Sequence, residues 1–305
     1  MTALLALALF TAAVGWGAPR LLARADWVVR GPVTAMVLWV GLLLAFASAV
    51  AMAVHAVSEP GHLAAGPGRW LGQWLGRTVG EESVEGPAGH RKALAVGALV
   101  LAGAATVVGP AWVRAARARR RHRGLLDLVA RQERSGNGRS GGWWSVEDTR
   151  AAAWCVPGRG GRVVLSRGAV ELLDPAQRAA VLAHERAHLR ARHHLLVGAV
   201  AALGRALPRL PLTRAAAEQV PLLAEMAADD RALRLCAPRT LAAALCVVAT
   251  GPAPEAATLA AGHLGVVQRV RRLLPTRTLS PALRAACWTL ALTLPAVPVL
   301  LTCGP

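Results

Sequence analysis

Four long stretches without a charged side chain constrain what this chain can fold into more than any other feature of its sequence. A helix needs about 20 mostly apolar residues to cross the hydrocarbon core of a bilayer, and core helices of soluble proteins rarely run so long without a charge. Because 54% of the residues are hydrophobic, the sequence predicts a multi-pass membrane protein. Its four transmembrane helices are expected at residues 1–19, 31–58, 93–113 and 285–305.

The first stretch has an alternative interpretation as a secretory signal peptide. Such a signal carries a positive charge before its apolar run. Here the first basic residue, Arg20, follows the run. We therefore expect a retained transmembrane helix with the N-terminus outside the cell.

The placement of arginine predicts the orientation in the membrane, because cytoplasmic loops collect Lys and Arg. Arginines are dense from Arg114 to Arg123 and again from Arg269 to Arg284, whereas residues 59–92 balance four basic residues with four acids. We therefore expect 59–92 to be an extracytoplasmic loop and 114–284 to be a cytoplasmic domain at the plasma membrane.

The net charge of +18 fits the same picture. A basic cluster beside a membrane span binds anionic lipid headgroups and fixes topology. Nucleic-acid binding is the competing interpretation, but the densest cluster abuts a span and no DNA-binding motif accompanies it. We expect the lipid bilayer as a partner and no nucleic acid. The five cysteines show no Cys-x-x-Cys spacing, which argues against a zinc finger or a disulfide framework.

The fold class expected for 114–284 is mainly α, with one small β-hairpin. Two short apolar runs, 151–156 and 162–166, flank a Gly-rich connection, as in a hairpin. Asp174 and Pro175 predict a helix start, since Asp caps free N–H groups and Pro suits the first helical position. That helix should reach about His194, with Leu207 as its furthest limit. Further helices are expected at 214–235, 240–248 and 265–274.

The expected helix from Pro175 carries the residues that predict chemistry, in the stretch His184-Glu185-Arg186-Ala187-His188. His184 and His188 are four residues apart, so both imidazoles project from one helix face. They can occupy two corners of a tetrahedral zinc site, and Glu185 can take a proton from a zinc-activated water. The alternative is a pair of solvated histidines on a basic helix face.

A catalytic zinc ion needs a third protein ligand, and Glu225 on the next long helix is the best candidate. Asp229 lies one turn further on the same face, where its carboxylate can accept the second N–H of a ligand histidine. Acids are scarce in this chain and the neighbours of Glu225 are mostly apolar, which favours a functional pair over ordinary helix-surface acids.

These residues resemble a known family. His184 to His188, followed by Glu225-x-x-Ala-Asp229, looks like the gluzincin membrane peptidases, most closely the BlaR/MecR-type antirepressor peptidases and, next, the HtpX and CAAX prenyl endopeptidase family. The resemblance covers nearly the whole chain, including the layout of the spans. It implies one zinc ion held by His184, His188 and Glu225.

The resemblance also implies roles for other residues. Glu185 would be the general base, and Asp229 would orient a ligand histidine. Val163, Val164 and Leu165 would form an edge strand that pairs with an extended substrate.

A weaker similarity lies at His263 and Arg269, which are spaced like a His-Pro…Arg segment of the second family. There the resemblance implies roles near the transition state or in holding the site. Leu264 replaces the Pro, and the alternative is a helix-start histidine and a membrane-facing arginine. His193 stands where these families often have an acid, and we interpret it and His194 as surface or outer-shell residues.

The function predicted from these features is a zinc-dependent metalloendopeptidase cleaving a protein or peptide substrate at the cytoplasmic membrane face, in regulatory signalling or membrane protein quality control. The alternatives are a zinc-binding scaffold that binds a regulator without cleaving it, and a basic membrane-surface protein with chance histidines. A homodimer is a further partner to consider. The sequence ends at Pro305 without the extracellular penicillin-sensor domain of the antirepressor sensors, so we expect no role in β-lactam sensing.

Overall fold

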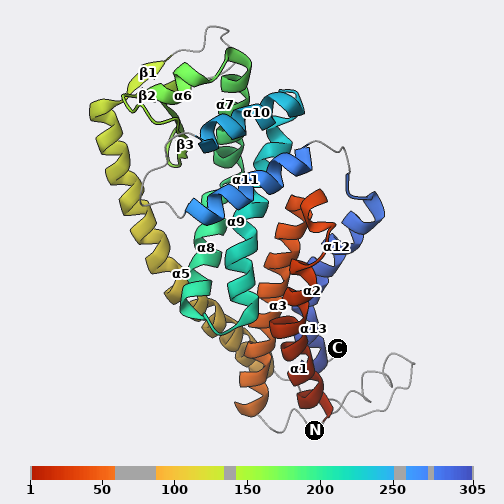
Figure 1. The fold of residues 1–305 in the computed structure, drawn as a ribbon. Coiled ribbons are helices and arrows are strands. Elements are labelled where there is room, and N and C mark those ends of the chain that lie inside the picture. The colour runs from red at the N-terminus through yellow and green to blue at the C-terminus, as the bar shows by residue number, and fades with distance from the viewer. Residues whose placement is uncertain (1, 59–86, 134–141, 251–258, 274–277, 304–305) are drawn as a thin grey trace. The chain divides into compact units, whose positions relative to one another are not determined.

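The computed structural model describes residues 2–58, 87–133, 142–250, 259–273 and 278–303. Figure 1 shows a mainly helical chain with one small sheet. The chain divides into two compact units. Unit 1 comprises residues 1–110, 200–219 and 279–305, and unit 2 comprises 111–199 and 220–278.

Unit 1 contains the apolar helices at the two ends of the chain. They are α1 (Thr2–Ala12), a π-helical turn (Ala13–Gly17), α2 (Ala18–Ala23), α3 (Pro32–Ser58), α12 (Pro281–Thr293) and α13 (Val297–Cys303). Helix α3 contacts α1, α12 and α13. A Cβ atom on Gly41 would lie 2.6 Å from the carbonyl oxygen of Ala291. Glycine therefore permits α3 and α12 to approach closely, as small residues do between membrane helices.

Three helices among the described residues are long and apolar enough to cross a membrane, at Leu4–Ala23, Pro32–Ala56 and Pro281–Thr302. The sequence predicted four. The predicted span at 93–113 falls within α5 (Pro87–Val129), a helix of 43 residues. Most side chains from 87 to 101 lie outside the described part of the chain, and arginines follow from Arg114 onward. Of the predicted extracytoplasmic loop 59–92, residues 59–86 are also outside it.

Unit 2 contains the sheet, whose strand order is β1-β2-β4-β3. The strands are β1 (Arg131–Glu133), β2 (Trp143–Val146), β3 (Ala153–Val156) and β4 (Arg162–Ser166). Strands β3 and β4 form the predicted antiparallel hairpin. Strands β1 and β2 were not predicted.

The position of β4 corrects the prediction of an edge strand at Val163, Val164 and Leu165. Strand β4 is paired on both sides, in parallel with β2 and antiparallel with β3. Its backbone groups are already used in the sheet, so it cannot add an extended substrate. Strand β3 is the edge of the sheet on this side.

The helices that follow the sheet are α6 (Arg167–Leu172), α7 (Pro175–Ala191), α8 (His193–Ala206), α9 (Pro211–Ala232), α10 (Pro238–Thr250) and α11 (Leu259–Leu273). Asp174 caps α7, as the sequence predicted, and it also forms a capping box with Gln177. The expected helix to His194 ends earlier, at Ala191, because Arg192 adopts a left-handed conformation with φ of 52°.

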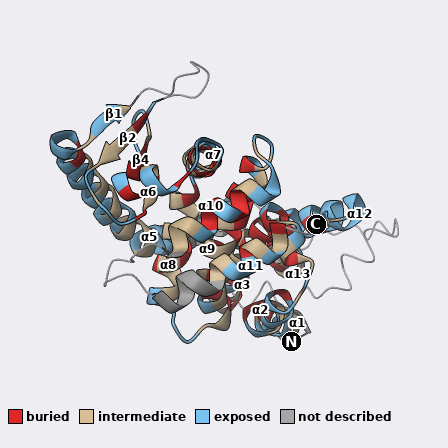
Figure 2. Ribbon diagram, turned by 45° about the horizontal axis from the view of Figure 1, so that its top comes forward, coloured by how far each residue is buried: buried red, intermediate tan, exposed pale blue. Residues whose placement is uncertain are grey.

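The core of unit 2 lies where α7, α9, α10 and α11 meet. Buried residues of α7 and α10 are red in Figure 2. The cluster is built mainly from alanine and leucine, including Ala180, Ala183, Ala232, Leu241 and Leu273. Small alanines let the helices approach closely, so that polar side chains from three of them can meet at one point.

Candidate metal site

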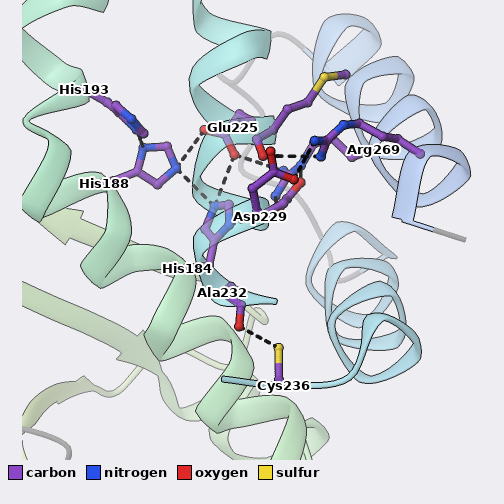
Figure 3. A network of polar contacts seen from close by, with 11 residues as sticks. His184, His188, His193, Glu225, Asp229, Ala232, Cys236 and Arg269 are labelled. Carbon is purple, nitrogen blue, oxygen red and sulfur yellow. Dashed lines mark hydrogen bonds and ion pairs between the residues drawn. The ribbon is translucent and has the colours of Figure 1, made fainter. Parts of the chain in front are cut away.

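Helix α7 presents the H-E-x-x-H residues from its buried side. His184 is 5% exposed, and the side chain of His188 is 15% exposed. Their Nε2 atoms lie 3.1 Å apart, as expected for imidazoles one turn apart on a helix. The two histidines therefore offer two nitrogens to a common point (Figure 3).

Helix α9 brings a third ligand, the carboxylate of Glu225, to the same point. Glu225 Oε2 lies 3.3 Å from Nε2 of His184, and Oε1 lies 3.4 Å from Nε2 of His188. Ligands about 2.0–2.1 Å from a tetrahedral zinc ion are about 3.3 Å from one another. One ligand atom from each of His184, His188 and Glu225 lies within 4.8 Å of the other two, and the closest contacts of each pair match that spacing, so the three residues fit a zinc ion.

The ionisation state of the Glu225 carboxylate is also that expected of a metal ligand. Burial opposes its ionisation, but contacts with His184 and His188 and the nearby Arg269 outweigh burial and hold the pKa of Glu225 well below its ordinary value. The carboxylate is therefore charged at neutral pH. Arg269 places its guanidinium 2.9 Å from Glu225 Oε2.

Asp229, one turn after Glu225, lies behind His184. Its carboxylate is 0% exposed and Oδ1 lies 2.9 Å from Nδ1 of His184, although the contact is bent away from hydrogen-bond geometry. Arg269 donates two hydrogen bonds to Asp229, of 2.8 and 2.7 Å. Burial raises the pKa of Asp229, but these contacts outweigh it and lower the pKa overall.

The same contacts raise the basicity of His184. Burial alone would lower its pKa, but the carboxylates of Asp229 and Glu225 raise the pKa of His184 to about 9. The metal-free site therefore holds a proton on His184 at neutral pH, and zinc must displace it.

His193 lies behind the other ligand histidine. It is 7% exposed, and its Nδ1 is 3.0 Å from Nδ1 of His188. Burial, with electrostatic contributions from the nearby His188 and Arg231, lowers the pKa of His193 to about 4. Sequence reasoning left this residue as a surface or outer-shell histidine, and the structure places it in contact with a ligand.

A cleft of about 400 Å³ opens at these residues. Glu185 lines it beside both histidines, and the edge strand β3 lines it with Ala153, Trp154 and Cys155. Burial, together with the charge of Glu185, raises the pKa of Cys155 to about 12, so the thiol is neutral. Apolar side chains from α7 and α10 complete the wall, at Val181, Leu241, Leu245 and Val248.

The structure brings together most of the residues singled out from the sequence. His184, Glu185, His188, Glu225 and Arg269 line one cleft, with Asp229 behind it. His263 belongs to α11, but its side chain lies outside the described residues. Val163, Val164 and Leu165 lie inside the sheet and not at the cleft edge.

Comparison with known proteins agrees with this site. Residues 115–216 match the model of peptidase family M48. The match covers the sheet and the two histidines of α7, and it stops within α9 before Glu225. No curated protein and no solved structure gives a significant match to the chain.

The site and the family match together define a zinc metallopeptidase of the H-E-x-x-H type. Three helices are long and apolar enough to cross a membrane, which indicates a membrane metalloprotease, and His184, His188 and Glu225 are its candidate zinc ligands. The finer resemblance to antirepressor peptidases stays a prediction.

Proposed function

We propose that this chain is an endopeptidase that cleaves protein substrates at the cytoplasmic face of the cell membrane, in regulatory signalling or in quality control of membrane proteins. The observation that carries the proposal is one cleft in which ligand atoms of His184, His188 and Glu225 lie within 4.8 Å of one another, with Glu185 beside them.

The residues of the cleft divide the chemistry between them. A bound zinc ion supplies Lewis acidity and a water of lowered pKa. Glu185 directly follows the ligand His184 and lines the cleft, so it can take a proton from the attacking water and deliver it to the leaving nitrogen. Arg269 offsets the charges of Glu225 and Asp229.

Substrate binding is proposed at the open edge of β3. Ser166 N–H donates to the carbonyl of Ala152, so the even-numbered residues of this strand bond to β4, and Ala153 and Cys155 direct their N–H and C=O groups to the other side. Among the described residues, no strand pairs there. An extended peptide can add to this edge, which adjoins the zinc ligands.

The membrane location of the reaction rests on the distribution of arginine. Exposed arginines Arg114, Arg117, Arg120 and Arg121 follow the apolar part of α5, as in a cytoplasmic juxtamembrane segment. At about 1.5 Å per residue, the 43 residues of α5 span about 65 Å. This length is enough to cross a bilayer and continue beyond it, so we retain 93–113 as a proposed fourth span. The homodimer stays a prediction.

The direct test compares the wild type with Glu185→Gln on a generic unfolded protein substrate, with zinc content measured in the same samples. Loss of a general base costs about 10²–10⁴-fold in rate, so we expect Glu185→Gln to cleave at least 100-fold more slowly while keeping its zinc. Glu218→Gln is the matched control, because Glu218 is 65% exposed on α9.

Equal cleavage by the wild type and Glu185→Gln would show that Glu185 is not the base. Full zinc occupancy without cleavage by any form would favour the alternative, a zinc-binding scaffold that holds a regulator without cutting it.

A further inference from the structure

We infer that His193 is a positioning residue for the zinc ligand His188. By accepting a hydrogen bond from the Nδ1–H of His188, it holds that imidazole in the tautomer and orientation that present Nε2 to the metal. This inference rests on the metal site described above and adds to it a residue that the sequence motif does not contain.

The geometry around His188 assigns the direction of the hydrogen bond. Nε2 of His188 faces the Nε2 of His184 and the carboxylate of Glu225, so it is the nitrogen that a metal would use. A neutral imidazole bound through Nε2 carries its proton on Nδ1. That nitrogen lies 3.0 Å from Nδ1 of His193. His188 is therefore the donor, and His193 accepts with its own proton on Nε2.

The arrangement of the rings supports a specific contact. The ring planes of His188 and His193 stand at 88°, with centroids 4.8 Å apart. His193 lies on the far side of His188 from Glu225, as Figure 3 shows, so it supports the ligand and does not compete for the metal. At 7% exposure, the acceptor is shielded from water that could replace it.

The end of helix α7 between His188 and His193 makes this contact possible. Residues five apart on a continuous helix point about 140° away from each other, so His193 could not reach His188 if α7 continued. The left-handed Arg192, with φ of 52°, ends α7. Helix α8 then starts at His193, and the turn directs this side chain back to α7.

The two ligand histidines are thus supported in different ways. His184 contacts the carboxylate of Asp229, which is itself paired with Arg269. His188 instead contacts the imidazole of His193. Outer-shell partners of ligand histidines typically contribute 10- to 100-fold to metal affinity, and we expect His193 to contribute in this range.

The test measures zinc affinity of the full chain in detergent by competition with a chelator of known affinity, which needs no proteolysis. We expect His193→Phe, which keeps a ring but removes the acceptor, to weaken zinc binding 10- to 100-fold. His193→Asn restores an acceptor oxygen and should recover most of the loss. His194→Phe is the matched control, because His194 is adjacent but has no described contact with His188.

Two further measurements distinguish a loss of ligand positioning from a loss of folding. Thermal unfolding of the metal-free forms identifies a variant that fails to fold, and the absorption spectrum of bound Co²⁺ reports ligand geometry. We expect a changed spectrum for His193→Phe and a nearly normal one for His193→Asn.

The inference is overturned if His193→Phe binds zinc as tightly as the wild type, or if Phe and Asn weaken binding equally. Failure of the wild type itself to bind zinc would overturn the metal site and, with it, the proposed function.

Discussion

At the scale of single residues, charge around the two ligand histidines organises the site. Asp229 is fully buried and contacts both His184 and Arg269. Removing one partner of a buried ion pair costs about 3–5 kcal/mol, and the low end applies here because Arg269 keeps its contact with Glu225. This carboxylate therefore supports the fold as well as the ligand.

Substitution of Asp229 should therefore destabilise the protein even without metal. We expect Asp229→Ala to lower the free energy of unfolding of the metal-free protein by about 3 kcal/mol, measured by chemical denaturation in detergent. Asp230→Ala should cost less, since Asp230 pairs with Arg272 at a site where its side chain is 39% exposed. Equal effects of the two substitutions would contradict the role of Asp229.

Zinc affinity should depend on pH through His184. Its pKa of about 9 lies above the ordinary 6.5, so the metal-free site holds a proton that zinc must displace. Apparent affinity should rise about tenfold per pH unit as pH increases toward 9 and level off above it. For the metal-free protein the sign is opposite, because the stabilisation from the protonated His184 is complete below pH 6.5 and is lost as pH rises through 9.

Chelator competition at several pH values checks this dependence, with calorimetry to count the protons released. An affinity that is constant between about pH 7 and about pH 8.5 would contradict protonation of His184.

The sequence could single out residues of the candidate site where one helix period was enough. His184, Glu185 and His188 follow from their spacing, and Glu225 and Asp229 from a second helix with few acids. The contact between His193 and His188 could not be predicted, because residues five apart face different sides of a continuous helix and meet only if the helix ends between them. The helix end depends on a non-glycine residue, Arg192, in a left-handed backbone conformation.

At the scale of elements, the sheet shows the limit of prediction from sequence. The apolar runs at 151–156 and 162–166 predicted the β3–β4 hairpin, which the structure confirms. Strand β2 pairs in parallel with β4, and such a distant pairing leaves no local pattern. Without β2, β4 looks like an edge. With it, β4 is interior and β3 takes the edge position.

The edge role of β3 predicts the effect of a proline there. Ala153→Pro removes an N–H that faces away from β4 and should leave the hairpin ladder intact, since proline is tolerated on edge strands. We expect cleavage of an extended peptide to fall about tenfold, the value of one lost hydrogen bond of about 1.4 kcal/mol. Zinc affinity should not change.

The matched control for that proline is Ala153→Gly, which keeps the N–H. If Ala153→Pro cleaves peptides as fast as Ala153→Gly, the substrate does not bind along β3.

At the scale of the whole molecule, apolar length predicted a membrane protein, and three of the predicted spans lie in helices that can cross a bilayer. Their limits shift by a few residues, because helices such as α2 and α12 continue past the first charged side chain. Orientation depends on arginine placement, which the fold itself does not report.

The proposed orientation can be tested with a thiol of the chain itself. Cys246 is the exposed cysteine among those described, on α10 in unit 2. A membrane-impermeant maleimide should label Cys246 only after the cells are opened, with Cys246→Ser as the control for labelling elsewhere. Labelling of Cys246 in intact cells would place the zinc domain outside and contradict the proposed topology.

The central claim, a zinc site made by His184, His188 and Glu225, is tested most directly by the zinc content of the purified protein. The wild type should carry one zinc ion per chain, and Glu225→Ala should lose it at the same free zinc concentration while remaining folded. A wild type without zinc, or a Glu225→Ala variant that retains zinc as tightly as the wild type, would contradict the account.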